Sequence, residues 1–152
     1  MNRIAAASLC LALALPAAAQ AQQAGKWRVS CDEGPCQAYF SVLKDGKPLL
    51  SWSMVRDPKT ENVVAMLRLP VMVALPPGAQ ILVGDKTIPA GFQFCDGTGC
   101  TAVALLDAPG LKALQAAPKA RVAWFAYGAA AATTVELEID GLTEALGLLA
   151  SH

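Results

Sequence analysis

Apolar and polar positions alternate along most of the chain after residue 25, and this period of two predicts short β-strands. The alternating or largely apolar segments are residues 26–31, 36–43, 49–56, 63–69, 92–95, 100–106, 121–127 and 133–140. In the last segment, Val135, Leu137 and Ile139 alternate with three acidic residues. We therefore expect these apolar side chains to face the core and the acidic side chains to face solvent.

Turn-forming residues separate the predicted strands. An Asp-Gly pair at residues 45–46 joins two apolar-rich segments, which is a strong signal for a hairpin. Residues 69–85 are strongly apolar, but Pro70, Pro76 and Pro77 exclude one long central strand, because proline cannot donate a ladder hydrogen bond. We predict two short strands in this region with a Pro-Pro-Gly turn between them.

Two short helices interrupt the strands. Asp107 is a suitable N-cap for a helix over residues 108–115, which carries a proline in its first turn. Residues 141–149 have leucines at helical spacing, and we expect this helix to cover an edge or open end of the sheet. The predicted fold is all-β, a β-sandwich or partly closed barrel of about eight or nine short antiparallel strands.

Residues 1–21 have the three parts of a secretory signal peptide. Arg3 provides a positive start, residues 4–15 are apolar, and small residues allow cleavage after Ala19 or Ala21. The apolar stretch is too short to span a bilayer, which takes roughly 20 residues. We expect the mature chain to have no transmembrane segment and to lie in the periplasm, to be secreted, or to associate with the outer envelope.

The mature chain, residues 22–152, has the length of a single domain with one core. The whole chain carries 12 basic and 12 acidic side chains, and loss of Arg3 with the leader leaves a formal charge of −1. The charges are scattered and form no basic patch. This composition argues against nucleic acid binding and against strong attraction to anionic lipid.

Four cysteines remain in the mature chain. An even number of cysteines in an exported protein predicts disulfides. The pairs Cys31/Cys36 and Cys95/Cys100 each flank four residues rich in Gly, Asp or Pro. If the flanking segments are strands, the two cysteines of each pair come close enough to bond. We predict these two local structural disulfides, while a longer-range pairing such as Cys31 with Cys95 remains open.

The cysteine spacing also permits two chemical alternatives. Structural zinc sites use cysteine pairs with two to four intervening residues, but an oxidising compartment and the lack of an internal histidine argue against zinc. A thiol-disulfide oxidoreductase or isomerase could use a Cys-x4-Cys pair, although such enzymes usually carry Cys-x-x-Cys at the start of a helix.

The chain shows no recognisable catalytic set. Its one histidine, His152, is the last residue. Ser-His-Asp and Cys-His catalytic sets need a positioned imidazole, so the terminal location of His152 argues against both. The carboxylates considered for paired chemistry are Asp32 with Glu33, Asp57 with Glu61, and Asp96. Aspartates in loops usually stabilise turns. We therefore predict no catalytic, cofactor-binding or metal-binding residue and no cofactor.

Four motifs occur in order: W-x-V-x-C at residues 27–31, a proline-punctuated run at 67–85, F-x-x-C-x-x-x-G-C-x-A at 92–102 and G-L-T-E-A-L at 141–146. Their order and spacing resemble the invasion-associated locus B family of secreted bacterial proteins, over roughly residues 25–150. The last motif departs from the family pattern at Leu142, where the family often has Phe.

This resemblance implies a periplasmic or envelope-associated β-sandwich without known enzymatic activity, with the four cysteines as structural bridges. Founding members of the family are linked to host-cell entry, so a link to invasion is a further expectation. We predict a non-catalytic protein that binds another protein or an envelope component, whose identity and oligomeric state the sequence does not specify. The alternatives are the thiol-disulfide enzyme and a carbohydrate-binding sandwich that uses exposed Trp or Tyr side chains.

Overall fold

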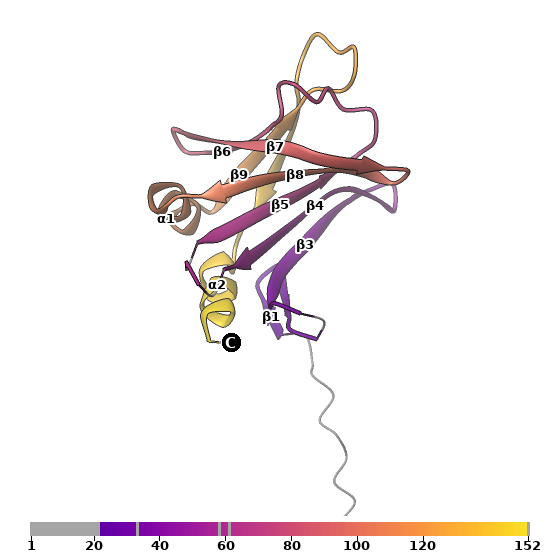
Figure 1. Cartoon of the computed structure of the whole chain (residues 1–152). Helices are drawn as coiled ribbons and strands as arrows, with labels where there is room; N and C mark the ends of the chain where they lie inside the picture. The colour runs from indigo at the N-terminus through magenta and orange to yellow at the C-terminus, as the bar shows by residue number, and fades with distance from the viewer. Residues whose placement is uncertain (1–21, 33, 58, 61, 152) are drawn as a thin grey trace, which may run out of the picture.

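The computed structural model describes residues 22–151 except residues 33, 58 and 61, and the predicted leader and His152 lie outside the described residues. Within the described residues the chain forms ten strands and two helices (Figure 1). The strands are β1 (Gln22–Ala24), β2 (Trp27–Ser30), β3 (Gln37–Lys44), β4 (Lys47–Arg56), β5 (Val63–Leu69), β6 (Ala79–Val83), β7 (Lys86–Asp96), β8 (Gly99–Leu106), β9 (Lys119–Trp124) and β10 (Thr133–Glu138). The helices are α1 (Ala108–Ala116) and α2 (Leu142–Ala150).

All of these strands belong to one antiparallel sheet with the order β1-β2-β3-β4-β5-β8-β7-β6-β9-β10. The sheet curls into a half-barrel (Figure 1). This architecture confirms the predicted antiparallel β fold in its partly closed barrel form. The strand count exceeds the prediction because β1 has a polar sequence without alternation and becomes a strand only by pairing with β2.

Residues 70–78 form a loop, whereas the sequence predicted a short strand before the Pro-Pro-Gly turn. The loop contacts the sheet through an isolated bridge between Val73 and Ala126. Its prolines cannot donate ladder hydrogen bonds, so only the segment that follows them, β6, joins the sheet.

Strand β7 starts earlier than the predicted strand at residues 92–95 and contains Pro89. Pro89 faces Gln80 of β6. On its other side, β7 pairs with β8 only from Gly91 onward. A proline is tolerated at this position because one edge of β7 has no partner strand there.

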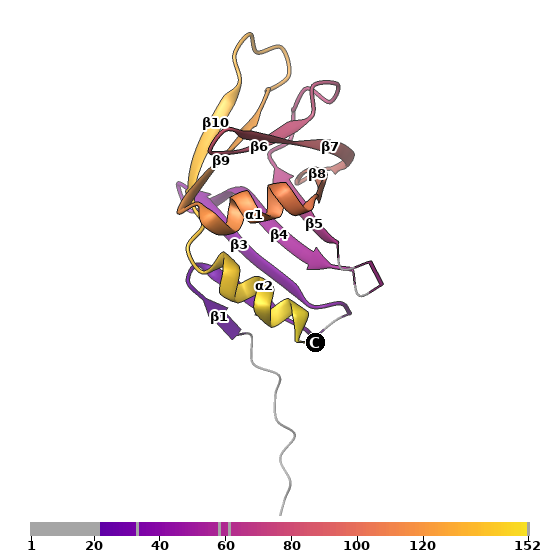
Figure 2. The ribbon, with the colours of Figure 1, turned by 90° about the vertical axis from the view of Figure 1, so that its left-hand side faces the viewer.

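Both predicted helices form, and Figure 2 shows them in front of the curled sheet. The carboxylate of Asp107 accepts a hydrogen bond from the amide of Gly110 at 2.7 Å and caps α1, as its sequence position predicted. Helix α2 packs on strands β1 to β4 and also contacts α1. Its buried face has helical spacing and consists of Leu142, Ala145, Leu146 and Leu149.

Three aromatic side chains on neighbouring strands form the centre of the core under α2. Trp27 packs edge-on against Phe40 and Trp52, with ring centroids 4.6 and 5.9 Å away. Both tryptophans are fully buried, and neither indole N–H has a hydrogen-bond partner among the described residues. Packing therefore holds this cluster together.

The two ends of the sheet meet at a contact that we call the seam, formed by Gly25, Lys26, Asp140 and Gly141. The amide of Lys26 donates to the carbonyl of Asp140 at 3.4 Å. Gly25 and Gly141 have φ values of 57° and 82°, and a Cβ atom on either residue would overlap the opposite backbone. The seam requires glycine both for its backbone conformation and for the close approach of the two segments.

Candidate functional site

The four cysteines form the two predicted local disulfides. Cys31–Cys36 joins the end of β2 to the start of β3, with the Cα atoms 4.1 Å apart. Cys95–Cys100 crosses the β7–β8 hairpin, where the two residues face each other in the ladder. Each bridge therefore closes a strand-turn-strand unit.

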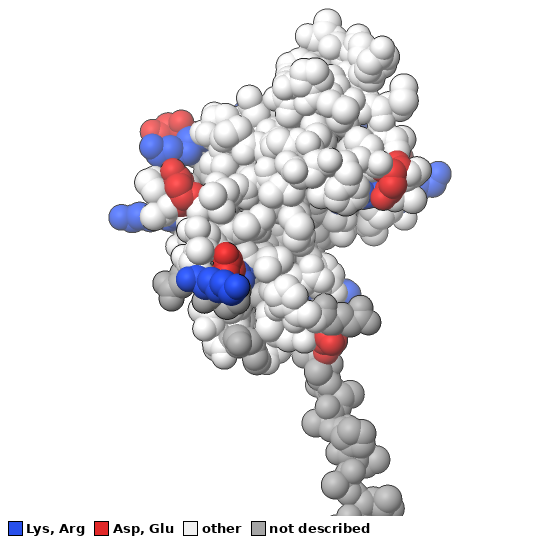
Figure 3. Space-filling view, viewed as in Figure 1, with Lys and Arg blue, Asp and Glu red and all other residues white. Residues whose placement is uncertain are grey.

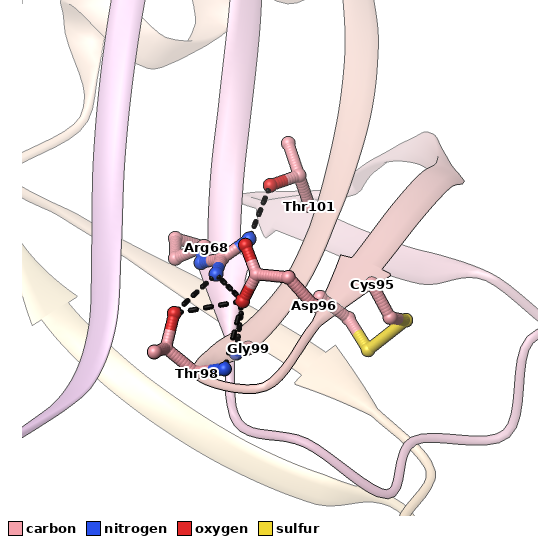
Figure 4. Close-up of a disulfide and its surroundings, with 7 residues drawn as sticks. Arg68, Cys95, Asp96, Thr98, Gly99 and Thr101 are labelled. Carbon is pink, nitrogen blue, oxygen red and sulfur yellow. Dashed lines mark hydrogen bonds and ion pairs between the residues drawn. A yellow bond between two sulfur atoms is a disulfide. The ribbon is translucent and has the colours of Figure 1, made fainter.

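Asp96 lies in the β7–β8 turn and accepts several hydrogen bonds (Figure 4). Its Oδ1 accepts from the amide and the hydroxyl of Thr98, both at 2.7 Å, and from the amide of Gly99 at 3.2 Å. Arg68 of β5 also donates to this oxygen. The Thr98 amide, the Thr98 hydroxyl and the Arg68 guanidinium hold the pKa of Asp96 well below its usual range. These contacts tie the turn to β5.

We expect Asp96→Asn to lower the thermal midpoint at pH 7, because the amide group removes the charge that Arg68 and the turn amides stabilise. The native pKa of Asp96 is lowered, so the carboxylate stabilises the fold above its unfolded pKa of about 4. This contribution fades as the pH falls from there toward the native pKa. Circular-dichroism melting of both proteins at several pH values should show the difference shrinking in acid.

The matched control is Asp85→Asn in the β6–β7 turn, which should change the thermal midpoint little at any pH. A difference between native protein and Asp96→Asn that stays constant from pH 7 into acid would contradict the electrostatic role.

The other candidate carboxylates also lie in turns. The amide of Lys59 donates to Asp57 at 2.8 Å and is the main cause of a lowered pKa for that carboxyl. Asp32 accepts from a serine hydroxyl at 3.0 Å. Glu33 and Glu61, considered as their partners, lie outside the described residues. Among the residues that are described, no three His, Cys, Asp or Glu side chains gather where they could hold a metal ion.

The aromatic residues divide between core and surface. Trp27 and Trp52 are fully buried, and Trp124 is 4% exposed. Tyr39 is half-buried, and Tyr127 is 74% exposed. The tryptophans therefore anchor the core and are not available to stack on a sugar.

A groove of about 720 Å³ lies between the two ends of the curled sheet, with β3 on one side and β10 on the other. Its lining residues are Gln23, Lys26, Arg28, residues 39–43, Lys119 and residues 136–138. The seam lies at the end of β10, next to this groove. This groove gathers polar and charged groups from several strands.

Strand segments with an unpaired edge, residues 40–43 of β3 and residues 136–138 of β10, form part of both walls of the groove. Residues 39–43 and 136–138 line it without a gap, although successive strand side chains point to opposite faces. An unbroken run of lining residues indicates that the strand edge borders the groove in addition to one face of the sheet. Strand β10 pairs only with β9, and β3 pairs with β2 only over residues 37–39. Two free edges therefore face the same space.

The groove carries more cations than anions. Lys119 pairs with Glu136 at 2.7 Å, and Lys26 pairs with Glu138. The Glu136 carboxylate raises the pKa of Lys119, and the Lys26 ammonium lowers the pKa of Glu138. Arg28 also lines the groove and has no ion pair within the described part of the chain. Its guanidinium is available to an acidic partner.

Sequence reasoning missed this groove. It correctly predicted that the acidic face of residues 133–140 is solvated, since Glu136 and Glu138 are exposed. Charged side chains are typical of edge strands, so this pattern was a signal for a sheet edge. Strand order decides which other edge lies opposite, and no local pattern encodes that order.

Comparison with known proteins identifies the fold and the family. A crystal structure of invasion associated protein B from Bartonella henselae superposes with a TM-score of 0.79, covering 87% of this chain and 96% of that chain at 20% identity. No curated protein matches the chain. No helix in the described part is long and apolar enough to cross a membrane. The family model described as Invasion associated locus B (IalB) protein matches residues 11–150, and the chain therefore belongs to the invasion associated locus B family.

Proposed function

We propose that this chain is an exported, non-catalytic binding protein of the cell envelope that takes an extended segment of a partner protein into the groove between β3 and β10. The observation that carries this proposal is the pair of free strand edges across one groove. An extended segment placed between them would add a strand to the sheet through main-chain hydrogen bonds.

Charge gives the groove a preference among extended segments. Lys26 and Lys119 are already paired with carboxylates, whereas Arg28 is not. An acidic side chain in the partner segment would complete the charge balance by pairing with Arg28. Main-chain bonds would supply affinity, and this ion pair would supply selectivity.

The predicted export of the protein supports an envelope role. The leader pattern of residues 1–21 allows cleavage after Ala19 or Ala21, and cleavage after Ala21 would leave residues 22–152 as a single mature domain. The two disulfides suit an oxidising compartment. A link to host-cell invasion would follow only if the partner segment belonged to a host protein.

A photo-crosslinking amino acid at position 41 tests the proposal, because Ser41 is exposed and lines the groove. In living cells, the crosslinked site on the partner should map by mass spectrometry to an extended segment with an acidic residue. Arg28→Glu should reduce the crosslinking yield by about tenfold, the effect of about 1.4 kcal/mol.

Two controls make this test specific. The crosslinker at exposed Gln115 on α1 should capture no such segment, and Lys112→Glu repeats the charge reversal away from the groove. Equal capture from positions 41 and 115, or equal effects of Arg28→Glu and Lys112→Glu, would contradict the groove as the binding site.

We expect neither disulfide to act as an exchange catalyst, because each closes a turn between strands and neither begins a helix. Equilibration of the mature protein with glutathione or dithiothreitol buffers should give reduction potentials below about −300 mV for both. A reduction potential near that of protein disulfide isomerase, about −180 mV, would instead support the alternative function as a thiol-disulfide oxidoreductase or isomerase.

A further inference from the structure

Two loops project together from one end of the half-barrel, residues 70–78 and residues 125–132 (Figures 1 and 2). We call this pair of loops the apolar tip. Neither loop contains an Asp, Glu, Lys, Arg or His, and the uncharged sequence extends over residues 69–84 and 122–135. Figure 3 shows the projecting end without a charged side chain, while the charges lie lower on the molecule.

Large apolar side chains are exposed on both loops of the tip. Val71 is 46% exposed, Met72 68%, Leu75 52% and Tyr127 74%. Soluble domains usually scatter such residues singly over the surface. In this protein the exposed apolar side chains are concentrated on two adjoining loops. The tip is therefore an exposed apolar surface.

Two backbone hydrogen bonds join the loops to each other. The amide of Ala74 donates to the carbonyl of Phe125 at 2.8 Å, and the amide of Tyr127 donates to the carbonyl of Met72 at 2.7 Å. Within single loops, Gly78 donates to Leu75 and Ala129 donates to Ala126, both at 3.0 Å. These bonds lower the cost of bringing this irregular chain to an apolar medium, where an unpaired backbone group is costly, and backbone groups at the interfacial depth of a bilayer can still bond to water.

Met72 is held in an unusual conformation at the tip. Its φ of 64° lies in the left-handed region, which non-glycine residues rarely adopt. The hydrogen bond from Tyr127 fixes its carbonyl, while the neighbouring Val73 is buried and anchors the loop to the core. Strained residues of this kind cluster at active sites, ligand clamps and switch regions.

We propose that the apolar tip docks onto a lipid bilayer by inserting Val71, Met72, Leu75 and Tyr127 into its interfacial region. The tip is a projection and not a hollow, it lacks charge, and hydrogen bonds join its two loops, and these properties favour shallow insertion. Tyr127 adds an aromatic side chain with a polar end, the type enriched at membrane interfaces. Because the loops carry no basic residues, attachment does not depend on anionic lipid and is insensitive to salt.

This inference goes beyond the proposed peptide binding and does not depend on it, since the tip and the groove use different residues. Attachment by the tip would hold the half-barrel at a membrane surface without a spanning segment.

The test is flotation of the mature protein with large unilamellar phosphatidylcholine vesicles in 50 mM and 500 mM NaCl. Native protein should float equally at both salt concentrations. The double variant Met72→Asp/Leu75→Asp should lose at least tenfold in partition coefficient. Leu105→Asp makes the same type of change at a side chain on β8 that is 65% exposed, and it should stay within twofold of native protein.

Thermal melting should show that all variants remain folded, because the changed side chains are exposed. A second readout is the tryptophan fluorescence of the variant Tyr127→Trp. The emission of the new tryptophan should shift to shorter wavelength when vesicles are added and should be quenched by brominated lipid. Failure of native protein to float, equal losses in the double variant and in Leu105→Asp, or binding only to anionic vesicles at low salt would overturn the proposal. Concentration-dependent dimers that the double variant abolishes, without vesicle binding, would assign the tip to a second copy of the chain.

Discussion

Gly141→Ala is expected to destabilise the protein by about 4 kcal/mol, near the upper end for single substitutions. Two costs combine at this position. The φ of 82° is strained for any residue with a side chain, by about 1–3 kcal/mol. The new Cβ atom would also overlap the carbonyl of Ala24, which is backbone and cannot move away without opening the seam. Urea unfolding of the mature protein measures the loss.

Two glycine controls separate these costs. Gly46 has a similar φ of 74° but nothing within 4 Å of a Cβ atom, so Gly46→Ala should show the conformational cost alone. Gly147 is exposed within α2 and has free space, so Gly147→Ala should stabilise by roughly 0.5–1 kcal/mol. If Gly141→Ala costs no more than Gly46→Ala, the close approach at the seam does not limit stability.

Trp52→Ala is expected to cost about 3–5 kcal/mol, because it removes a fully buried ring from the centre of the core. Trp52 lies on β4 between neighbours on both sides and packs against Trp27 and Phe40. Removal of its ring would leave a cavity bounded by these aromatic side chains. Urea unfolding with the midpoint and slope measured separately would give the change in stability.

The control for this core substitution is Leu105→Ala on β8, an apolar side chain that is 65% exposed. It should change the free energy of unfolding by less than about 0.5 kcal/mol. A loss below about 1.5 kcal/mol for Trp52→Ala would mean that the surrounding side chains collapse into the space.

Local patterns predicted the elements that depend on neighbouring residues. The hairpin at residues 45–46, the Asp107 cap, the buried face of α2 and the paired cysteines all follow from spacing within a few residues. The incorrect predictions of secondary structure also have local causes. Strand β1 is polar and lacks the alternation of apolar and polar residues that predicts a strand. The apolar segment at residues 70–78 resembles a strand in composition but forms a loop because it is rich in proline.

The candidate sites were less predictable than the elements. Asp96 was read as a turn residue, but the contribution of Arg68 from β5 became visible only when the strands were placed side by side. The exposure of Tyr127 beside Met72 likewise depends on two loops that are distant in the sequence.

The sequence by itself determined the antiparallel β class, the two short helices, the local disulfides and the family resemblance, because each is encoded in short-range spacing and residue type. Only the tertiary structure decided that the sheet curls until its ends meet at Gly25 and Gly141. That curling places two free strand edges across one groove and gathers the uncharged loops at one tip. Strand order and curvature arise from packing of the whole sheet on its helices, and no short segment of the chain carries that information.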